Sequence, residues 1–128
     1  MDTTKKFIQI FSGLKRAYGQ TKSKSKNDQG KLEGQSWIVP EPLTEDRGIK
    51  HLKGEEPSLG IIPIDENNEC RWGAIDVDTY DGFDHKKLVT KIVENKLPLI
   101  VCRSKSGGAH IFLFVTEPVA AKDMQIKL

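Results

Sequence analysis

The sequence of 128 residues lacks the features that mark membrane-spanning and secreted proteins. No apolar run approaches the roughly 18 residues that a spanning helix needs, and the N-terminus has no apolar signal-peptide segment. Cysteine is rare, because Cys70 and Cys102 are too few for a disulfide framework. We therefore expect a cytoplasmic protein without a membrane partner, in which both thiols are reduced and buried as small hydrophobic side chains.

Known signatures of ion and nucleotide binding are also missing. Residues 103–110 form neither a Walker A motif nor a GxGxxG fingerprint. An EF-hand loop that began at Asp76 would need an acid or amide in fifth place and glycine in sixth, where Tyr80 and Asp81 stand. A metal-dependent nuclease needs a group near its metals that activates water, and no ExK-like pair lies near Asp76. The sequence therefore gives little support to a nuclease.

The composition that is present, 37% hydrophobic and 30% charged, is that of an ordinary soluble domain. The net charge of +2 conceals three blocks, which are +6 over residues 1–31, −9 over 32–84 and +5 over 85–128. Such separation suits a site that holds cations beside polyanions. Solvated faces without any ligand have the same pattern, so this interpretation stays open.

The spacing of apolar residues predicts an α+β fold, a mixed or antiparallel sheet flanked by helices. Apolar residues at three- and four-residue intervals predict a helix over 3–18, and the polar stretch 19–34 predicts a flexible basic loop. Strands are expected at 59–64 and 70–77 and are predicted to pair as a hairpin, and the apolar run 99–102 is typical of a strand buried on both faces. The other expected elements are strands at 36–39 and 109–115, helices capped by Thr44 and Asp84, and a last helix with Pro118 in its first position.

Two carboxylates, Asp76 and Asp78, end the strand expected at 70–77. Alternate residues of a strand share one face at a spacing of about 6.6 Å, and oxygen ligands suit Mg²⁺ or Mn²⁺. Such a pair could bridge two metals about 3.5–4 Å apart, the arrangement used in phosphoryl transfer. The pattern also occurs by chance on protein surfaces, so it is weak alone.

Residues 103–110 combine two positive charges, two hydroxyl groups, a glycine pair and the imidazole of His110. Triphosphate binding needs such groups, because glycine lets backbone N–H groups approach the phosphates. A glycine hairpin turn beside a core histidine explains the same residues. One helix and one strand separate Asp78 from Ser104, and this crossover brings both strand ends to one sheet edge. His51 and His85 have no such neighbours and are predicted to lie on the surface.

Together the two motifs resemble those of the archaeo-eukaryotic primase superfamily, which includes primases, primase-polymerases and the polymerase domains of bacterial end-joining ligases. The superfamily's first motif is a strand that ends in two alternate aspartates, matched by Asp76-Val77-Asp78. Its second is a serine- and glycine-containing turn into a strand with a histidine, matched by Ser104 to His110. The stretches 60–63, 72–78 and 97–110 look most like the primase domains of TOTE-type conflict systems and related phage proteins.

The resemblance implies a nucleotidyltransferase, a DNA primase or primase-polymerase that uses Mg²⁺ or Mn²⁺ and nucleoside triphosphates on a DNA template or primer. It implies that Asp76 and Asp78 hold the metals and that His110 is the third catalytic residue, in contact with the triphosphate. The residues that it assigns to nucleotide binding are Arg103, Ser104, Lys105, Ser106, Gly107, Gly108 and His110.

The superfamily has a third motif, a later carboxylate that completes the metal site, and this sequence does not match it. Glu117 and Asp123 are the only acids after His110 and lie too close to it. We therefore expect residues 1–128 to be the N-terminal part of a primase-polymerase domain, interrupted before the third motif, with helicase or nuclease domains in the full-length protein. The alternatives are a catalytically incomplete module that binds nucleotide or single-stranded nucleic acid, and a plain structural domain.

Overall fold

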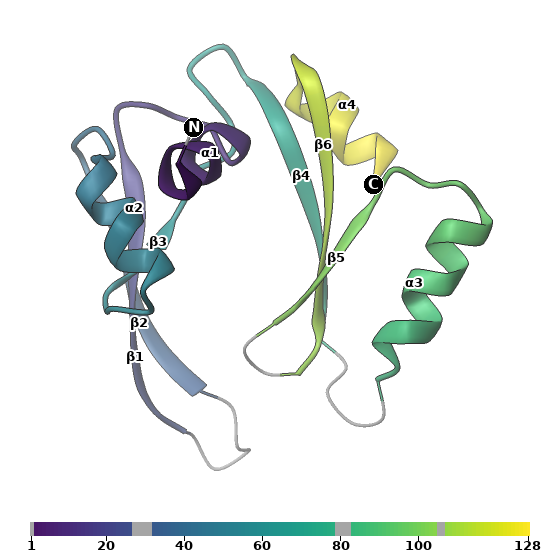
Figure 1. The fold of residues 1–128 in the computed structure, drawn as a ribbon. Helices are drawn as coiled ribbons and strands as arrows, with labels where there is room; N and C mark the ends of the chain where they lie inside the picture. The colour runs from purple at the N-terminus through teal and green to yellow at the C-terminus, as the bar shows by residue number, and fades with distance from the viewer. Residues whose placement is uncertain (1, 27–31, 79–82, 105–106) are drawn as a thin grey trace.

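Two three-stranded antiparallel sheets, with helices packed beside them, form the computed structural model of this chain (Figure 1). The structure describes residues 2–26, 32–78, 83–104 and 107–128. The mixture of helices and antiparallel strands confirms the α+β class that the apolar spacing predicts. None of the helices within these ranges has the length and apolar character that a membrane crossing requires.

The N-terminal half of the chain forms the first sheet, in the strand order β2-β1-β3. Gly19 of β1 lies opposite Ile38 on one side and Gly60 on the other. Gly48 lets the two helices of this half approach closely, because an added Cβ would lie 2.9 Å from Cδ1 of Ile8. The elements are α1 (Thr3–Ile10), β1 (Tyr18–Lys26), β2 (Leu32–Val39), α2 (Glu45–Leu52) and β3 (Ser58–Gly60).

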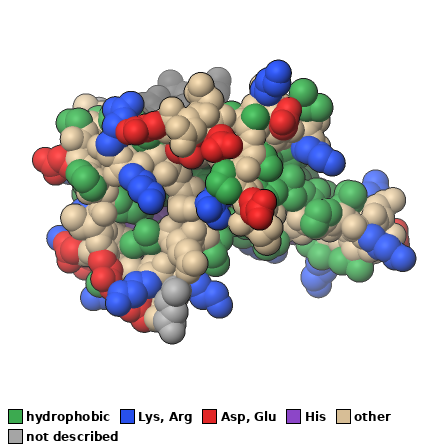
Figure 2. All heavy atoms as spheres, turned by 90° about the horizontal axis from the view of Figure 1, so that it is seen from above, with side chains coloured by type: hydrophobic (Ala, Val, Ile, Leu, Met, Phe, Trp, Pro, Cys, Tyr) green, Lys and Arg blue, Asp and Glu red, His purple; other side chains and the backbone are tan. Residues whose placement is uncertain are grey.

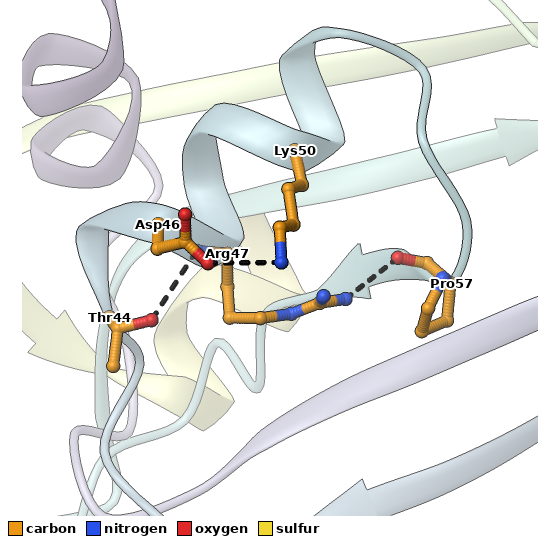
Figure 3. Close-up of polar contacts among 5 residues, drawn as sticks. All are labelled: Thr44, Asp46, Arg47, Lys50 and Pro57. Carbon is orange, nitrogen blue, oxygen red and sulfur yellow. Dashed lines mark hydrogen bonds and ion pairs between the residues drawn. The ribbon is translucent and has the colours of Figure 1, made fainter.

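Helix α2 begins where the sequence predicts, because the Thr44 hydroxyl accepts a hydrogen bond from the backbone N–H of Arg47 at 3.3 Å. The Asp46 carboxylate pairs with the Lys50 ammonium one turn later, at 3.2 Å. Arg47 donates through Nη2 to the carbonyl of Pro57 at 2.9 Å (Figure 3). This bond ties the helix to the segment that leads into β3.

The C-terminal half forms the second sheet, in the order β4-β6-β5. Because the central strand β6 is antiparallel to both neighbours, β4 and β5 run parallel to each other and are linked through α3. Asp84 caps α3 as predicted, accepting from the backbone N–H of Lys87 at 3.1 Å. The elements are β4 (Glu69–Val77), α3 (His85–Glu94), β5 (Ile100–Arg103), β6 (Ala109–Ala120) and α4 (Ala121–Lys127).

Different parts of the chain cover the two faces of the second sheet. On one face, Phe11 packs edge-on against the rings of Trp72 and Phe112, with centroid distances of 5.2 and 5.4 Å. On the other face, α4 covers Gly73, where an added Cβ would lie 2.7 Å from Cγ of Met124. Since Phe11 directly follows α1, this contact joins the two halves, and the face of Trp72 and Phe112 is the one that packs on the N-terminal half.

The first helix is shorter than the predicted 3–18, and that prediction is wrong beyond Ile10. The chain turns after Phe11, and the backbone N–H of Leu14 donates to the carbonyl of Ile62 at 2.8 Å. Tyr18 is buried, but at the start of β1. The apolar residues after Phe11 therefore reach the interior from a loop and a strand, and their helical spacing is coincidental.

The predicted loop over 19–34 is also wrong where the structure describes it, since β1 continues to residue 26 and β2 begins at residue 32. Residues 27–31 of that prediction lie outside the described residues. Lysine alternates with serine and threonine through β1, so no apolar face reveals the two-residue period of a strand. Polar contacts replace it, as between Thr21 Oγ1 and Ser36 Oγ at 2.8 Å.

Strand pairing and burial differ from the predictions in the second half as well. The hairpin of 59–64 with 70–77 does not form, because β3 pairs with β1 and β4 pairs with β6. The strand at 99–102 is not buried on both faces: β5 is an edge strand, and Ile100 is 55% exposed. Cys102 is exposed, contrary to the prediction, whereas Cys70 is buried as expected.

Pro118 lies inside β6 and does not open the last helix, which begins at Ala121. The pairing of β6 with β4 is irregular between Cys70 and Trp72, whose partners are Val119 and Phe114. Pro118 falls in this stretch of β6, where the missing N–H interrupts no regular ladder. Proline therefore marks an irregularity of the strand here and not a helix start.

Charges of both signs are interspersed on the face of the molecule in Figure 2. The separation of charge along the sequence therefore does not give this face a single sign. Folding brings the blocks together, as where Arg16 of the basic first block pairs with Glu66 of the acidic block at 3.1 Å.

Candidate functional site

Three strand ends meet at one edge of the second sheet. Val77 at the end of β4 and Arg103 at the end of β5 are both register partners of Ala109, the first residue of β6. The strand-end aspartates and the glycine turn therefore lie at the same edge, as the crossover through α3 requires.

Asp76 and His110 lie directly opposite each other on β4 and β6. Asp76 Oδ1 is 3.4 Å from His110 Nε2, and the side chains are 58% and 47% exposed. His110 and Phe112 share one face of β6 because side chains alternate along a strand, so the pair lies on the face that Phe11 covers further along the sheet. The carboxylate and the imidazole are thus adjacent and open to a ligand from solvent.

Asp78 follows the last residue of β4 and is exposed, two positions after Asp76. Two carboxylates at alternate positions offer the hard oxygen donors that Mg²⁺ and Mn²⁺ prefer, so the donor chemistry fits the expected metals. Among the residues that the structure describes, no group of three or more His, Cys, Asp or Glu side chains is arranged to hold a metal ion. The described part of the site therefore supplies two carboxylates.

The turn between β5 and β6 closes on Ser104, whose N–H donates to the Gly108 carbonyl at 3.1 Å and whose carbonyl accepts from the Gly107 N–H at 3.2 Å. Gly107 has a φ of +91°, a left-handed conformation that glycine adopts without strain. Gly108 lies so close to β4 that an added Cβ would overlap the Val77 carbonyl oxygen. The backbone conformation therefore favours glycine at position 107, and the close approach to β4 requires it at position 108. Lys105 and Ser106, the other predicted members of the turn, lie outside the described residues.

Arg103 is placed on the other face of the sheet from His110. Cys102 lies opposite His110 in the register, so the following residue starts from the face that α3 covers. Arg103 lines a hollow there of about 470 Å³. The other lining residues are His85, Lys86, Val89, Thr90 and Val101. Of the residues expected to bind nucleotide, the structure thus groups Ser104, Gly107, Gly108 and His110 at one edge and sets Arg103 behind it.

His85 is a residue of this edge that the sequence analysis missed. It is half-buried, and its Nε2 lies 2.8 Å from the Gly108 carbonyl oxygen. His51 is half-buried too, and its Nδ1 accepts from the Leu59 N–H at 3.0 Å. The surface prediction for these two histidines therefore holds only in part. Each contact joins different elements, so neither follows from local sequence. One local signal does point to His85. It directly follows Asp84, the predicted cap, and so it begins the helix that links the two strands of the motifs.

The sequence also matches a known protein family. Residues 5–126 match the model of a family described as "TOTE conflict system, Archaeo-Eukaryotic Primase domain". The match spans almost the whole chain and includes both motifs, residues 76–78 and 104–110. No curated protein matches the chain.

Proposed function

The chain belongs to the archaeo-eukaryotic primase domain family of TOTE conflict systems, and from this premise we propose that it forms the nucleotide- and metal-binding part of a primase-polymerase. At the level of the superfamily, membership implies primase-like nucleotidyl transfer. The substrates in this proposal are nucleoside triphosphates and a DNA template, single-stranded or primed. The 3′-oxygen of a primer or initiating nucleotide attacks the α-phosphate of the incoming nucleotide, a new P–O bond forms, and pyrophosphate leaves.

The contact between Asp76 and His110 is the observation that best supports the proposal. It sets a carboxylate, suited to a divalent cation, 3.4 Å from an imidazole, suited to a phosphate oxygen. The turn closed by Ser104 lies at the same sheet edge, because Ala109 and Val77 are register partners. A metal-bound triphosphate needs both kinds of group within one small region.

In this proposal Asp76 and Asp78 hold Mg²⁺ or Mn²⁺, which would neutralise the charge that develops on the phosphates. His110 binds an oxygen of the triphosphate, and the Ser104 hydroxyl binds another at the turn. These groups orient the nucleotide, and no covalent intermediate with the protein is needed.

The proposal is tested by calorimetric titration of the chain with dATP and with ATP in the presence of Mn²⁺. We expect Asp76→Asn and Asp78→Asn each to weaken binding by at least about tenfold, since each removes a metal ligand. Asp123→Asn is the matched control, because it makes the same charge change on α4, which packs on the opposite face of the sheet. Unchanged affinity in both site variants would contradict the proposal.

A second candidate is a module that binds nucleotide or single-stranded nucleic acid without turning it over. The absence of a three-ligand metal group among the described residues favours it. The two candidates differ in a primer-extension assay with labelled nucleotide and Mn²⁺. Extension by this chain excludes the module. Binding by calorimetry without extension is expected of both candidates, because this sequence does not match the third carboxylate motif of the superfamily.

A further inference from the structure

We propose that His85 is a positioning residue of the nucleotide site, which holds Gly108, and through it Ser104, in place by a hydrogen bond to the carbonyl group of Gly108. The inference rests on the proposed function, because the role that it gives to His85 is in triphosphate binding. His85 itself does not lie on the sheet face that bears Asp76 and His110. Its basis is the 2.8 Å contact between His85 Nε2 and the Gly108 carbonyl oxygen. This contact joins the first residue of α3 to the residue that precedes β6.

The donor in this contact is fixed before any ligand binds. A backbone carbonyl can only accept a hydrogen bond, so the contact requires a proton on Nε2 of His85. Asp84 holds the first turn of α3 by accepting from the Lys87 N–H at 3.1 Å. The imidazole also packs edge-on against Phe83, with ring centroids 4.7 Å apart and an interplanar angle of 88°. The helix cap sets the backbone of His85, and the Phe83 ring limits the orientation of the imidazole.

The acceptor is the point where three segments meet. The Gly108 carbonyl also accepts from the Ser104 N–H at 3.1 Å, and the Gly108 backbone packs against the Val77 carbonyl at the end of β4. Gly108 is buried, and the next residue, Ala109, is completely buried. The peptide group between them is thus held by the turn, by β4 and by α3. His85 supplies the only side-chain hydrogen bond among the contacts of this carbonyl that the described residues make.

This peptide group determines where the expected phosphate ligands lie. Ser104 closes the turn on Gly108, and His110 follows Gly108 by two residues. Without His85, the Ser104 N–H is the only described hydrogen-bond donor left to this carbonyl. Gly107 and Gly108 also lose more conformational freedom on ordering than other residues do. Triphosphate binding must then order the turn, and that cost weakens affinity.

A direct contact of His85 with phosphate is a different role, which the geometry disfavours. His85 does line the hollow beside Lys86 and Arg103. However, its Nε2 proton is already donated to the Gly108 carbonyl, so phosphate binding through Nε2 would cost that bond. The structure therefore assigns His85 to the turn and not to the ligand.

The test compares His85→Ala with His85→Gln, because a glutamine amide can place an N–H near the position of Nε2. The readouts are the calorimetric affinity for dATP with Mn²⁺ and the hydrogen-exchange rate of the Ser104 amide. We expect His85→Ala to weaken dATP binding about tenfold, the effect of one lost hydrogen bond, and to accelerate exchange at Ser104. His85→Gln restores affinity to within about threefold of wild type. The control His51→Ala removes a histidine that bonds Leu59 in the other half, and it leaves affinity unchanged.

The outcomes separate this inference from the proposed function. If wild type binds dATP and His85→Ala binds it equally well, the positioning role is wrong and the proposed function stands. If wild type itself shows no binding, the proposed function fails, and the role of His85 in triphosphate binding fails with it. If His85→Ala does not fold, His85→Asn takes its place, because the asparagine amide is too short to reach Gly108. If His85→Asn then binds dATP as tightly as His85→Gln does, the inference is overturned.

Discussion

Gly108 lies against the carbonyl group of Val77, where the turn after β5 meets the end of β4. Val77 separates Asp76 from Asp78, so the glycine backbone packs on the segment that bears both carboxylates. No residue with a Cβ fits there unless the backbone moves, since the added atom would overlap the Val77 oxygen. A direct backbone contact therefore sets the distance between the expected metal ligands and the expected phosphate turn.

We predict that Gly108→Ala destabilises the fold by about 1–3 kcal/mol, the usual cost of overpacking, and reduces nucleotide affinity because the turn shifts away from β4. The measurement is the free energy of unfolding in urea, followed by titration with dATP and Mn²⁺. Gly107→Ala is the matched control. Its φ of +91° strains alanine, but an added Cβ meets no atom within 4 Å, so we expect only about 1 kcal/mol. A smaller loss for Gly108→Ala than for Gly107→Ala would show that the contact with Val77 is not tight.

The two thiols are predicted to react at very different rates. Burial raises the pKa of the Cys70 thiol, and the negative charge of Asp65 raises it further, so less thiolate forms at a given pH. Cys102, on β5, is exposed and lies opposite His110 of β6. A disulfide reagent at pH 8 is therefore expected to modify Cys102 rapidly and Cys70 only slowly, with the Cys70 reaction gaining as pH rises. Cys102→Ser should remove the rapid phase, and retention of that phase would contradict the assignment.

Features set by neighbouring residues could be predicted from the sequence. The caps Thr44 and Asp84 each accept a hydrogen bond from the backbone N–H three residues later, which is a local interaction with a clear residue preference. The strand that ends at Val77 can be predicted for the same reason, because its apolar positions and the acids Asp76 and Asp78 are adjacent in the chain. The order of the two motifs then sufficed to suggest a common sheet edge.

Features set by distant residues could not be predicted. β1 has no apolar alternation, so only its pairing with β2 and β3 makes it a strand. The packing of Phe11 depends on Trp72, 61 residues away along the chain. Within the site, Arg103 was grouped with His110 by proximity in sequence, but one step of register moves it to the other face. His85 was missed because its partner Gly108 belongs to another element.

The two capped helices offer a comparison between stability and site geometry. We predict that Thr44→Ala and Asp84→Ala each lower the free energy of unfolding by about 1 kcal/mol, since each removes an N-cap hydrogen bond. Only Asp84→Ala should also weaken dATP binding, because α3 carries His85 and α2 does not. Urea denaturation gives the first quantity and calorimetry the second. Equal effects of both variants on affinity would mean that general destabilisation, and not the position of His85, controls the turn.

Divalent cations are predicted to stabilise the folded chain through Asp76 and Asp78. A ligand that binds only the folded state at about 100 times its Kd adds about 2.7 kcal/mol to the free energy of unfolding, so Mn²⁺ should raise Tm and EDTA should reverse the rise. Asp76→Asn and Asp78→Asn are each expected to reduce the Mn²⁺-dependent rise by about half or more, because each replaces a carboxylate ligand with a neutral amide, whereas Asp123→Asn should retain the full rise. Asp76→Asn also removes the charge 3.4 Å from His110, so its Tm without metal must first be compared with that of the wild type. An undiminished Mn²⁺ response in both site variants would place the metal elsewhere on the chain.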